Sequence, residues 1–205
     1  YRNGGGRIVW PAGSESFLAN PVWVIPNTQY DLNGSTLFGT SATDGKAFET
    51  AYHNGSALVT NIGTAYESQV VKYARVFGGH IENVERAFNF QNFNMLSKVH
   101  DIEVYNARRF GVFDACFYAA FENCMHSGGT INSIPSFLFS SANNAITLKA
   151  ITTTTEWCYH FSGGTTAVIL SGCTTEGGTT AIKITGDCLG LVIDGHYAEA
   201  VKDFL

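Results

Sequence analysis

A repeat of about 22 residues is the feature that most restricts how this chain can fold. Ile169–Glu176 aligns with Val192–Glu199, 23 residues later, and the glycine and glutamate of the two segments match. Ala150 stands 22 residues before Gly172 and fits the same template, without a glutamate in register. Self-similarity with a period of roughly 20 to 50 residues is typical of solenoids, in which each repeat adds one coil to a stack.

The repeated unit has the pattern of a short β-strand that ends in a tight corner. Ile102–Tyr105 and Ile182–Thr185 alternate apolar and polar residues, as a strand with one buried face does, and stretches with helical periodicity are nearly absent. Glycine, asparagine or another small residue follows the strand, and glycine and asparagine tolerate a left-handed backbone. The predicted corner column consists of Asn106, Asn123, Ala150, Gly172 and Gly195. Strand and corner repeated at a fixed period predict an all-β chain folded as a parallel β-helix.

The register of the middle coils is less regular. His80–Glu82 echoes Asp101–Glu103 at a spacing of 21 residues. The predicted corner residues Asn106 and Asn123 are only 17 residues apart, whereas Asn123 and Ala150 are 27 apart. The sequence therefore leaves the alignment of these coils open.

Composition and charge exclude several classes of protein. The chain has 205 residues, enough for one domain with a buried core, and charged residues make up 14% of it. The net charge is −5 and the basic residues are scattered, which argues against a nucleic acid or an anionic membrane surface as partner. The longest apolar run, Ala115–Phe121, is too short to cross a bilayer, so no membrane insertion is expected. Gly4–Gly6 lacks the Lys and Ser or Thr of a phosphate-binding loop, and no cofactor is expected.

The cysteines and histidines do not form a metal-binding pattern. The five cysteines include no CxxC pair, and their neighbours are small or apolar, so we expect small buried side chains without a disulfide framework. Cys158 and His160 lie close together in the sequence, but one such pair is a weak indication of a metal site. No metal site is predicted.

The two ends of the chain resemble a known family. Gly4–Gly13 (GGGRIVWPAG), Pro21–Asn27 (PVWVIPN) and Tyr30–Gly34 (YDLNG) resemble the opening coils of pectate-lyase-like right-handed parallel β-helices. Gly172–Glu176 (GCTTE) and Gly195–Glu199 (GHYAE) are similar to the G-x-Y-x-E coils of bacteriophage tailspikes and capsule depolymerases. The A-I-x-x-A helix that precedes the glycine-rich segment in that family is missing. We therefore expect one β-helix domain over 1–205, with opening coils in 1–40 and stacked coils in 80–205, cut from a longer tailspike chain.

The resemblance implies a function at the bacterial surface. It implies a homotrimeric spike at the virion tail that binds and degrades a capsular or O-antigen polysaccharide, as a glycoside hydrolase in preference to a polysaccharide lyase. The alternative is a non-catalytic carbohydrate-binding adhesin or a structural spike shaft, because β-helices also serve these purposes.

Three glutamates are the first candidates for catalysis. Glycoside hydrolysis uses two carboxyl groups roughly 5 to 9 Å apart, one as acid and one as base or nucleophile. If the coils stack in register, Glu176 and Glu199 occupy equivalent positions on neighbouring coils about 4.8 Å apart, a distance that suits a retaining pair. Repulsion between two close carboxylates favours a proton on one of them. Glu156, two residues out of register on the preceding coil, could flank the pair. The competing interpretation is that this glutamate has a turn-capping or interchain role, because it recurs in the resembling tailspikes whatever the substrate.

A second group of ionisable residues lies in the middle of the chain: Asp101, Glu103, Asp114 and Glu122, with His100, Arg108 and Arg109. In a lyase, a base removes a proton next to a uronate carboxylate while a cation neutralises that carboxylate. Arg108, Arg109 and His100 could take these roles. The alternative is that they are solvated outward positions of a strand and its turn.

Aromatic residues near the glutamates are candidates for substrate binding, because sugar rings stack on exposed aromatic faces. The predicted substrate-binding residues are Trp157, Tyr159, His160 and Tyr197. Phe88, Phe90 and Phe93 are expected in core stacks instead, and Trp10 and Trp23 are expected to pack in the opening coils.

Overall fold

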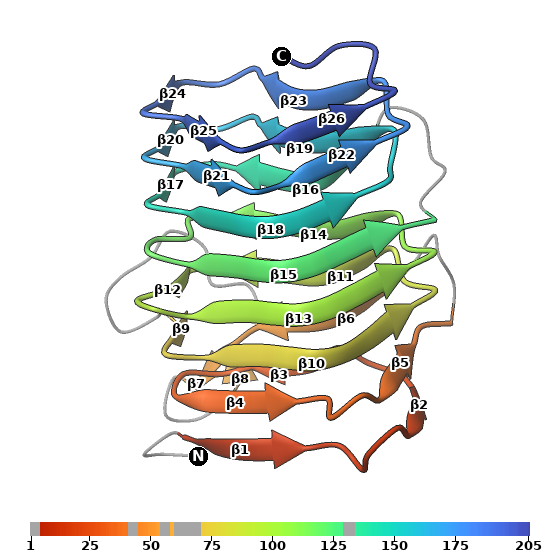
Figure 1. Cartoon of the computed structure of the whole chain (residues 1–205). Helices are drawn as coiled ribbons and strands as arrows, with labels where there is room; N and C mark the ends of the chain where they lie inside the picture. The colour runs from red at the N-terminus through yellow and green to blue at the C-terminus, as the bar shows by residue number, and fades with distance from the viewer. Residues whose placement is uncertain (1–4, 41–44, 54–57, 60–70, 129–133) are drawn as a thin grey trace.

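The chain winds into a stack of parallel strands, which confirms the predicted parallel β-helix. The computed structural model describes residues 5–40, 45–53, 58–59, 71–128 and 134–205, and no helix occurs among them. Parallel strands stack in about seven turns. In Figure 1 the front strands run left to right and those behind run right to left as the chain climbs from the N- to the C-terminus, which is a right-handed coil.

Sheet A is the larger sheet, and its central strands are long and bent. Towards both ends of the stack the long strand is replaced by two short ones; β18, for example, pairs with both β21 and β22. The strands of sheet A are β1 (Gly6–Val9), β2 (Glu15–Phe17), β4 (Thr28–Asp31), β5 (Thr36–Phe38), β10 (Arg75–Glu82), β13 (Lys98–Tyr105), β15 (Ala120–Ser127), β18 (Thr147–Thr153), β21 (Ile169–Ser171), β22 (Thr174–Glu176), β25 (Val192–Asp194) and β26 (Tyr197–Glu199).

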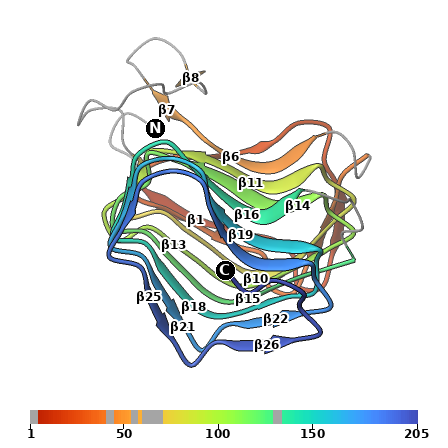
Figure 2. The same cartoon turned by 90° about the horizontal axis from the view of Figure 1, so that it is seen from above.

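Sheet B lies across the coil from sheet A (Figure 2). Its strands are β3 (Val22–Val24), β6 (Lys46–Thr50), β11 (Arg86–Gln91), β14 (Arg109–Asp114), β16 (Pro135–Ser140), β19 (Trp157–Phe161) and β23 (Thr180–Ile184).

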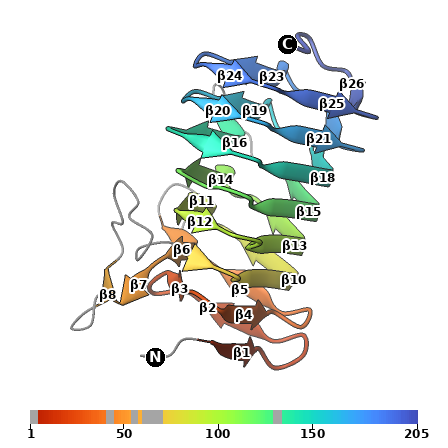
Figure 3. The same ribbon diagram turned by 90° about the vertical axis from the view of Figure 1, so that its left-hand side faces the viewer.

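Short strands connect the end of sheet B to the next strand of sheet A, along the side that faces the viewer in Figure 3. These pairs leave a narrow third side on the coil. They are β9 (Val71–Lys72) with β12 (Phe93–Asn94), and β17 (Asn143–Asn144) with β20 (Thr165–Thr166) and β24 (Cys188–Leu189). The antiparallel pair β7 (Tyr52–His53) and β8 (Leu58–Val59) lies outside the stack.

Phenylalanine rings fill the interior of the coil. Phe88, Phe90 and Phe93 are fully buried, as the sequence predicted, and their ring centroids lie 4.4 to 5.2 Å apart. Phe113 of sheet B reaches Phe121 of sheet A at 4.5 Å, so the rings join the two sheets. Each such aromatic pair adds about 0.5 to 1.5 kcal/mol beyond the effect of burying its area.

The corner column predicted from the sequence exists, with one member misplaced. Asn123, Ala150, Gly172 and Gly195 all have left-handed backbones, with φ between 50° and 61°. Strand pairing places Asp101, with φ of 56°, next to Asn123 in this column. Asn106 also has a positive φ, but it lies beyond the end of β13 at the next corner. Its assignment to the column was therefore wrong.

The strand register also corrects the alignment of the early repeat. His80 pairs with Glu103, so the alignment of His80 with Asp101 that the sequence suggested was wrong. The long spacing between Asn123 and Ala150 is real, because the strand register makes the two residues neighbours in the column and the coil between them is longer.

The cysteines behave as small core residues, as predicted. Cys116, Cys124, Cys158 and Cys173 are buried, Cys188 is half-buried, and all five are free. Burial raises the pKa of the Cys116 and Cys124 thiols to about 12. These thiols therefore stay protonated and unreactive at neutral pH.

Trp10 packs against the core from the opening coil, as predicted, and Trp23 is half-buried. Within the described residues, no helix has the length and apolarity needed to cross a bilayer.

Candidate functional site

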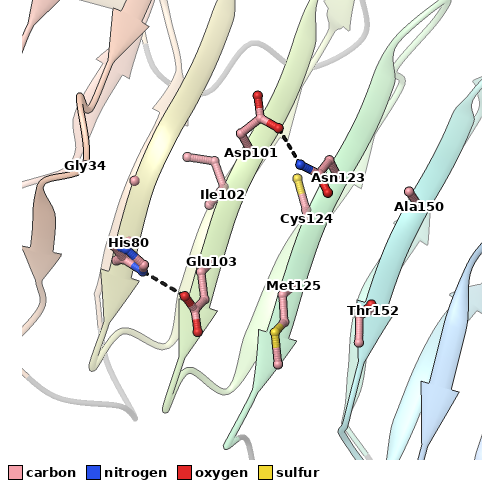
Figure 4. Close-up of a pocket in the computed structure, with 11 residues that line it drawn as sticks. Gly34, His80, Asp101, Ile102, Glu103, Asn123, Cys124, Met125, Ala150 and Thr152 are labelled. Atoms are coloured by element: carbon pink, nitrogen blue, oxygen red, sulfur yellow. Dashed lines mark hydrogen bonds and ion pairs between the residues drawn. The ribbon is translucent and has the colours of Figure 1, made fainter.

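A shallow groove of about 430 Å³ follows the bend of sheet A on the outside of the coil. His80, Asp101, Glu103 and Asn123 contribute its polar groups (Figure 4). Gly79 lies in its floor, where a Cβ atom would come within 2.5 Å of the Leu32 Cβ atom. The close approach of these two coils therefore requires glycine at this position.

Asp101 is held as an anion at the edge of the groove. Its carboxylate accepts hydrogen bonds from Asn123 Nδ2 at 2.6 Å and from His100 Nδ1 at 2.7 Å. Both bonds lower the pKa of Asp101, and the bond from His100 has the larger effect. The His100 ring is held in turn by stacking on Phe77, with ring centroids 4.8 Å apart. Asp101 therefore presents a fixed negative charge to the groove at neutral pH.

Glu103 points away from Asp101, as Figure 4 shows, and its carboxylate contacts the His80 ring instead. The Glu103 Oε2 atom and the His80 Nδ1 atom are 2.9 Å apart, and both side chains are nearly half exposed. The two carboxylates of the groove thus turn to different partners and do not converge as an acid–base pair would. The groove offers separate hydrogen-bond donors and acceptors, which suits the binding of a hydroxyl-rich ligand.

Glu176 and Glu199 lie directly opposite each other on β22 and β26, so their predicted equivalence is confirmed. Both side chains are exposed, and neighbouring strands lie about 4.8 Å apart. The Tyr197 hydroxyl donates a hydrogen bond of 2.9 Å to Glu199 Oε2, and this bond raises the pKa of Tyr197. Two exposed carboxylates and an exposed tyrosine thus gather at the last coils of sheet A. Their catalytic and binding roles stay predictions.

A row of outward side chains joins this glutamate pair to the groove. Strand pairing aligns Glu103, Met125, Thr152, Thr174 and Tyr197 along the stack. Four strand spacings separate Glu103 from Tyr197, or about 19 Å. We call the outer surface of sheet A from His80 to Glu199 face A. An extended polymer lying along face A would contact both the groove and the glutamate pair.

Glu156 lies outside this row. It precedes β19 on the turn from sheet A to sheet B, and its carbonyl oxygen accepts bonds from the Thr179 and Thr180 amides. Glu156 therefore lies on the turn that leads into sheet B, whereas Glu176 ends a strand of sheet A.

The predicted aromatic residues do not form one surface. Trp157 and His160 are half-buried residues of β19 in sheet B, whereas Tyr197 belongs to β26 of sheet A, and Figure 2 shows these two strands on different sides of the coil. Lys183 Nζ lies 4.1 Å from the Trp157 ring centroid, and His160 Nε2 hydrogen-bonds Thr185 Oγ1 at 2.8 Å.

The prediction that Tyr159 binds substrate was wrong. Its side chain is 1% exposed and packs inside the coil against Phe137, with ring centroids 5.3 Å apart. Each strand of sheet B after β6 has at least two consecutive buried residues at or near its start, and in β19 these are Cys158 and Tyr159. A strict alternation of exposed and buried residues from Trp157 would predict that Cys158 is buried and Tyr159 is exposed. Aligning Tyr159 with Phe137, its partner on the preceding coil, would have placed it in the core.

The lyase arrangement was also wrong as a single site. His100 and Asp101 belong to sheet A, whereas Arg109 begins a strand of sheet B, so the proposed base and cations lie on different sides of the coil. Glu122 of sheet A forms an ion pair with Lys98, with 2.5 Å between Oε2 and Nζ. Asp114 lies at the end of β14 in sheet B. Within the described part of the chain, no group of three or more His, Cys, Asp or Glu side chains could hold a metal ion.

Comparisons with known proteins identify a fold. No protein-family model and no curated protein sequence matches the chain. A solved structure from Parabacteroides merdae, described as a candidate glycosyl hydrolase, superposes with a TM-score of 0.54 at 11% identity, over 96% of this chain and 84% of that one.

Two further structures superpose less closely. One is described as a glycoside hydrolase, with a TM-score of 0.46 and 8% identity, over 93% of this chain and 37% of that one. The other is a variant tailspike protein of E. coli bacteriophage HK620, with a TM-score of 0.39 and 12% identity, over 97% of this chain and 51% of that one. At 11% identity, the likeness to the Parabacteroides merdae structure concerns the fold alone.

Proposed function

We propose that this protein binds a bacterial surface polysaccharide along face A and cleaves it by hydrolysis, with Glu176 and Glu199 as the catalytic pair. The observation that carries the proposal is the direct pairing of these two glutamates on adjacent strands. Retaining glycosidases hold their two carboxyl groups roughly 5 to 5.5 Å apart, close to the spacing of neighbouring strands.

The surroundings of the pair fit polysaccharide binding. Tyr197 is 55% exposed beside Glu199 and offers a ring face to a sugar. The groove at His80 and Asp101 lies on the same face, about 19 Å from the pair, and would bind further sugar units of an extended chain.

The experiment is incubation of the protein with a panel of purified capsular and O-antigen polysaccharides. New reducing ends report cleavage, and ultraviolet absorbance of an unsaturated uronate reports elimination. Glu176→Gln and Glu199→Gln should each lower kcat by about 10²- to 10⁴-fold, the usual effect of losing a general acid or base.

Glu82→Gln is the matched control for these variants. Glu82 occupies the same position on an earlier strand, but its neighbours Phe38 and Tyr105 carry no carboxylate. Because Glu82 lies on face A, its substitution can change KM, but it should leave kcat unchanged. Cleavage that survives in both Glu176→Gln and Glu199→Gln, or products that carry the unsaturated chromophore, would refute the proposed hydrolysis by this pair.

A second candidate function is binding without cleavage, as an adhesin or a spike shaft. The openness of the glutamate pair favours it, because the side chains of Glu176 and Glu199 are both exposed to solvent. Retained binding with no cleavage of any bound polysaccharide would establish this alternative.

The resemblance to tailspikes extends the proposal to a homotrimer at a virion tail. Light scattering of the purified protein should then give three times the chain mass of 22.2 kDa. A mass of one chain at micromolar concentration would contradict the trimer for this chain.

A further inference from the structure

The outside of sheet B carries a column of cations. Strand pairing places Lys46 opposite Arg86, and Arg86 opposite Arg109, at the starts of β6, β11 and β14. Arg108 immediately precedes Arg109 in the chain. Like charges directly opposite each other on neighbouring strands are destabilising. Four neighbouring cations therefore need negative charge beside them.

The carboxylates next to Lys46 and Arg86 already have partners. Glu49 accepts bonds from Lys46 Nζ and from Asn89 Nδ2, each at 2.6 Å. Glu85 forms an ion pair with Arg86. Neither Arg108 nor Arg109 forms an ion pair with any residue in the described ranges.

The two arginines are also partly dehydrated. Arg108 Nε and Arg109 Nη1 are buried, and neither atom has a hydrogen-bond partner among the described residues. Burial is the main cause that lowers the pKa of Arg109; the charge of Glu85 raises it, and those of Arg86 and Arg108 lower it further. A buried guanidinium nitrogen without a partner is costly, and an anion held by the accessible nitrogens of the same side chains would offset part of that cost.

An aromatic ring continues the column. The register of β14 and β16 places Pro135 beside Arg109, and Trp157 pairs with Pro135, so the backbone of Trp157 lies two strand spacings from that of Arg109, or about 10 Å. Lys183 places a further cation over this ring. The charge of Arg109 also acts on His160, a neighbour of Trp157. Burial is the main cause that lowers the pKa of His160, and the charges of Lys183 and Arg109 lower it further. We call Arg86, Arg108, Arg109, Trp157 and Lys183 the basic strip.

We propose that the basic strip binds a carboxylate-bearing sugar of an acidic polysaccharide, with Arg108 and Arg109 on the carboxylate and the sugar ring against Trp157. The fork of an arginine side chain matches a carboxylate with two parallel hydrogen bonds. This inference rests on the proposed function in taking the ligand to be a polysaccharide, and it adds a second site, across the coil from face A. It also narrows the ligand to a polymer that carries carboxylates.

The experiment is calorimetric titration of the whole chain with a hyaluronan octasaccharide and with the same octasaccharide after reduction of its carboxylates to alcohols. The unmodified sugar should bind at least tenfold more tightly, and its affinity should fall as salt is added. Arg108→Gln combined with Arg109→Gln should remove this preference, whereas Arg109→Lys should keep part of it, because lysine retains the charge but not the fork.

Arg75→Gln is the control, because Arg75 is an exposed arginine on sheet A, away from the basic strip, and its loss removes one of the two charges that the double variant removes. It should leave binding unchanged. Fluorescence of the unmodified protein gives a readout that needs no variant: the acidic octasaccharide should change the Trp157 emission, and a Trp157→Phe chain should lose that change.

Two results would overturn the inference. One is equal binding of the acidic and the reduced octasaccharides; the other is inorganic phosphate or sulfate binding as tightly as the acidic sugar, which would show an anion site without sugar recognition. Neither result bears on cleavage at Glu176 and Glu199. Conversely, loss of the proposed hydrolysis would leave the binding preference of the basic strip intact.

Discussion

Face A and the basic strip lie on opposite sides of the same coils, and they differ in how far their charges are already satisfied. On face A, Asp101 accepts two hydrogen bonds and Glu103 pairs with His80. On the basic strip, buried nitrogens of Arg108 and Arg109 have no partner within the described part of the chain. The coils share one interior, so the difference comes from the outward residues alone. In a β-helix, the interior fixes the fold, and the outward positions are free to carry different chemistry on each side.

The largest effect is expected where the two sides depend on the same residue. Phe113 contacts Phe90, Phe121, Phe137 and Phe139, with ring centroids 4.5 to 6.3 Å apart. Phe113→Ala should lower the free energy of unfolding by about 3 to 5 kcal/mol, as for other buried phenylalanines. Urea denaturation measures this loss, and binding at both sides should weaken together as the fraction unfolded rises. Loss of binding at one side only would show that the two sides do not share a cooperative core.

A smaller effect, which depends on pH, is expected at the histidine that joins the sheets. His126 of β15 donates from Nε2 to the Ala107 carbonyl oxygen at 3.0 Å and accepts at Nδ1 from the Ser136 hydroxyl at 2.6 Å. Burial lowers the pKa of His126 from 6.5 to about 4. The folded state therefore binds this proton less readily than the unfolded state does.

The stability that His126 contributes is complete above pH 6.5 and is lost as the pH falls from 6.5 to 4. The loss amounts to about 3 kcal/mol, from 1.36 kcal/mol per pKa unit. Urea titrations at several pH values measure it, and His126→Gln should flatten this part of the profile. The pKa values of His160 and His196 are also lowered, so these residues also reduce stability as the pH falls, and the variant keeps their part of the slope. An identical slope in the variant would contradict the assignment to His126.

The smallest effect should separate the two sides. Asp101→Asn removes one of the two carboxylates of the groove, and asparagine tolerates the left-handed backbone at this corner, so the fold should be kept. Binding of a carboxylate-reduced polysaccharide along face A should weaken about three- to tenfold, the net contribution of one ordinary hydrogen bond, because asparagine keeps an acceptor oxygen but not the charge. Binding of acidic sugar at the basic strip should not change. A parallel loss of both would indicate that Asp101 acts through the fold.

The repeat in the sequence predicted the coil because the corner demands particular residues. Asn123, Gly172 and Gly195 were identifiable since few residue types adopt a left-handed backbone, and the repeat ties them together. Asp101 was missed in favour of Asn106 because both positions have a positive φ, and only the pairing of β13 with β15, which sets Asp101 beside Asn123, separates the two corners.

The sites were harder to predict than the coil. Glu176 and Glu199 follow directly from the repeat, because equivalent positions in consecutive coils must pair. The groove and the basic strip depend on which outward residues meet on a face. Trp157 and Tyr197 are both near a glutamate in the sequence but lie on different sheets. The local sequence pattern does not assign a strand to a sheet. Because Cys158 and Tyr159 are both buried, simple alternation along β19 wrongly predicted an exposed Tyr159.

The stereochemistry of cleavage tests the catalytic pair most directly. Carboxylates on adjacent strands are close enough for one to attack the sugar, which makes a retaining hydrolase. Proton NMR of the first products from a polysaccharide that the protein cleaves would show the configuration at the new reducing end before it equilibrates. The pairing of Glu176 with Glu199 predicts that this configuration matches the linkage that was cleaved. An inverted product would require carboxyl groups further apart and would contradict Glu176 and Glu199 as the catalytic pair.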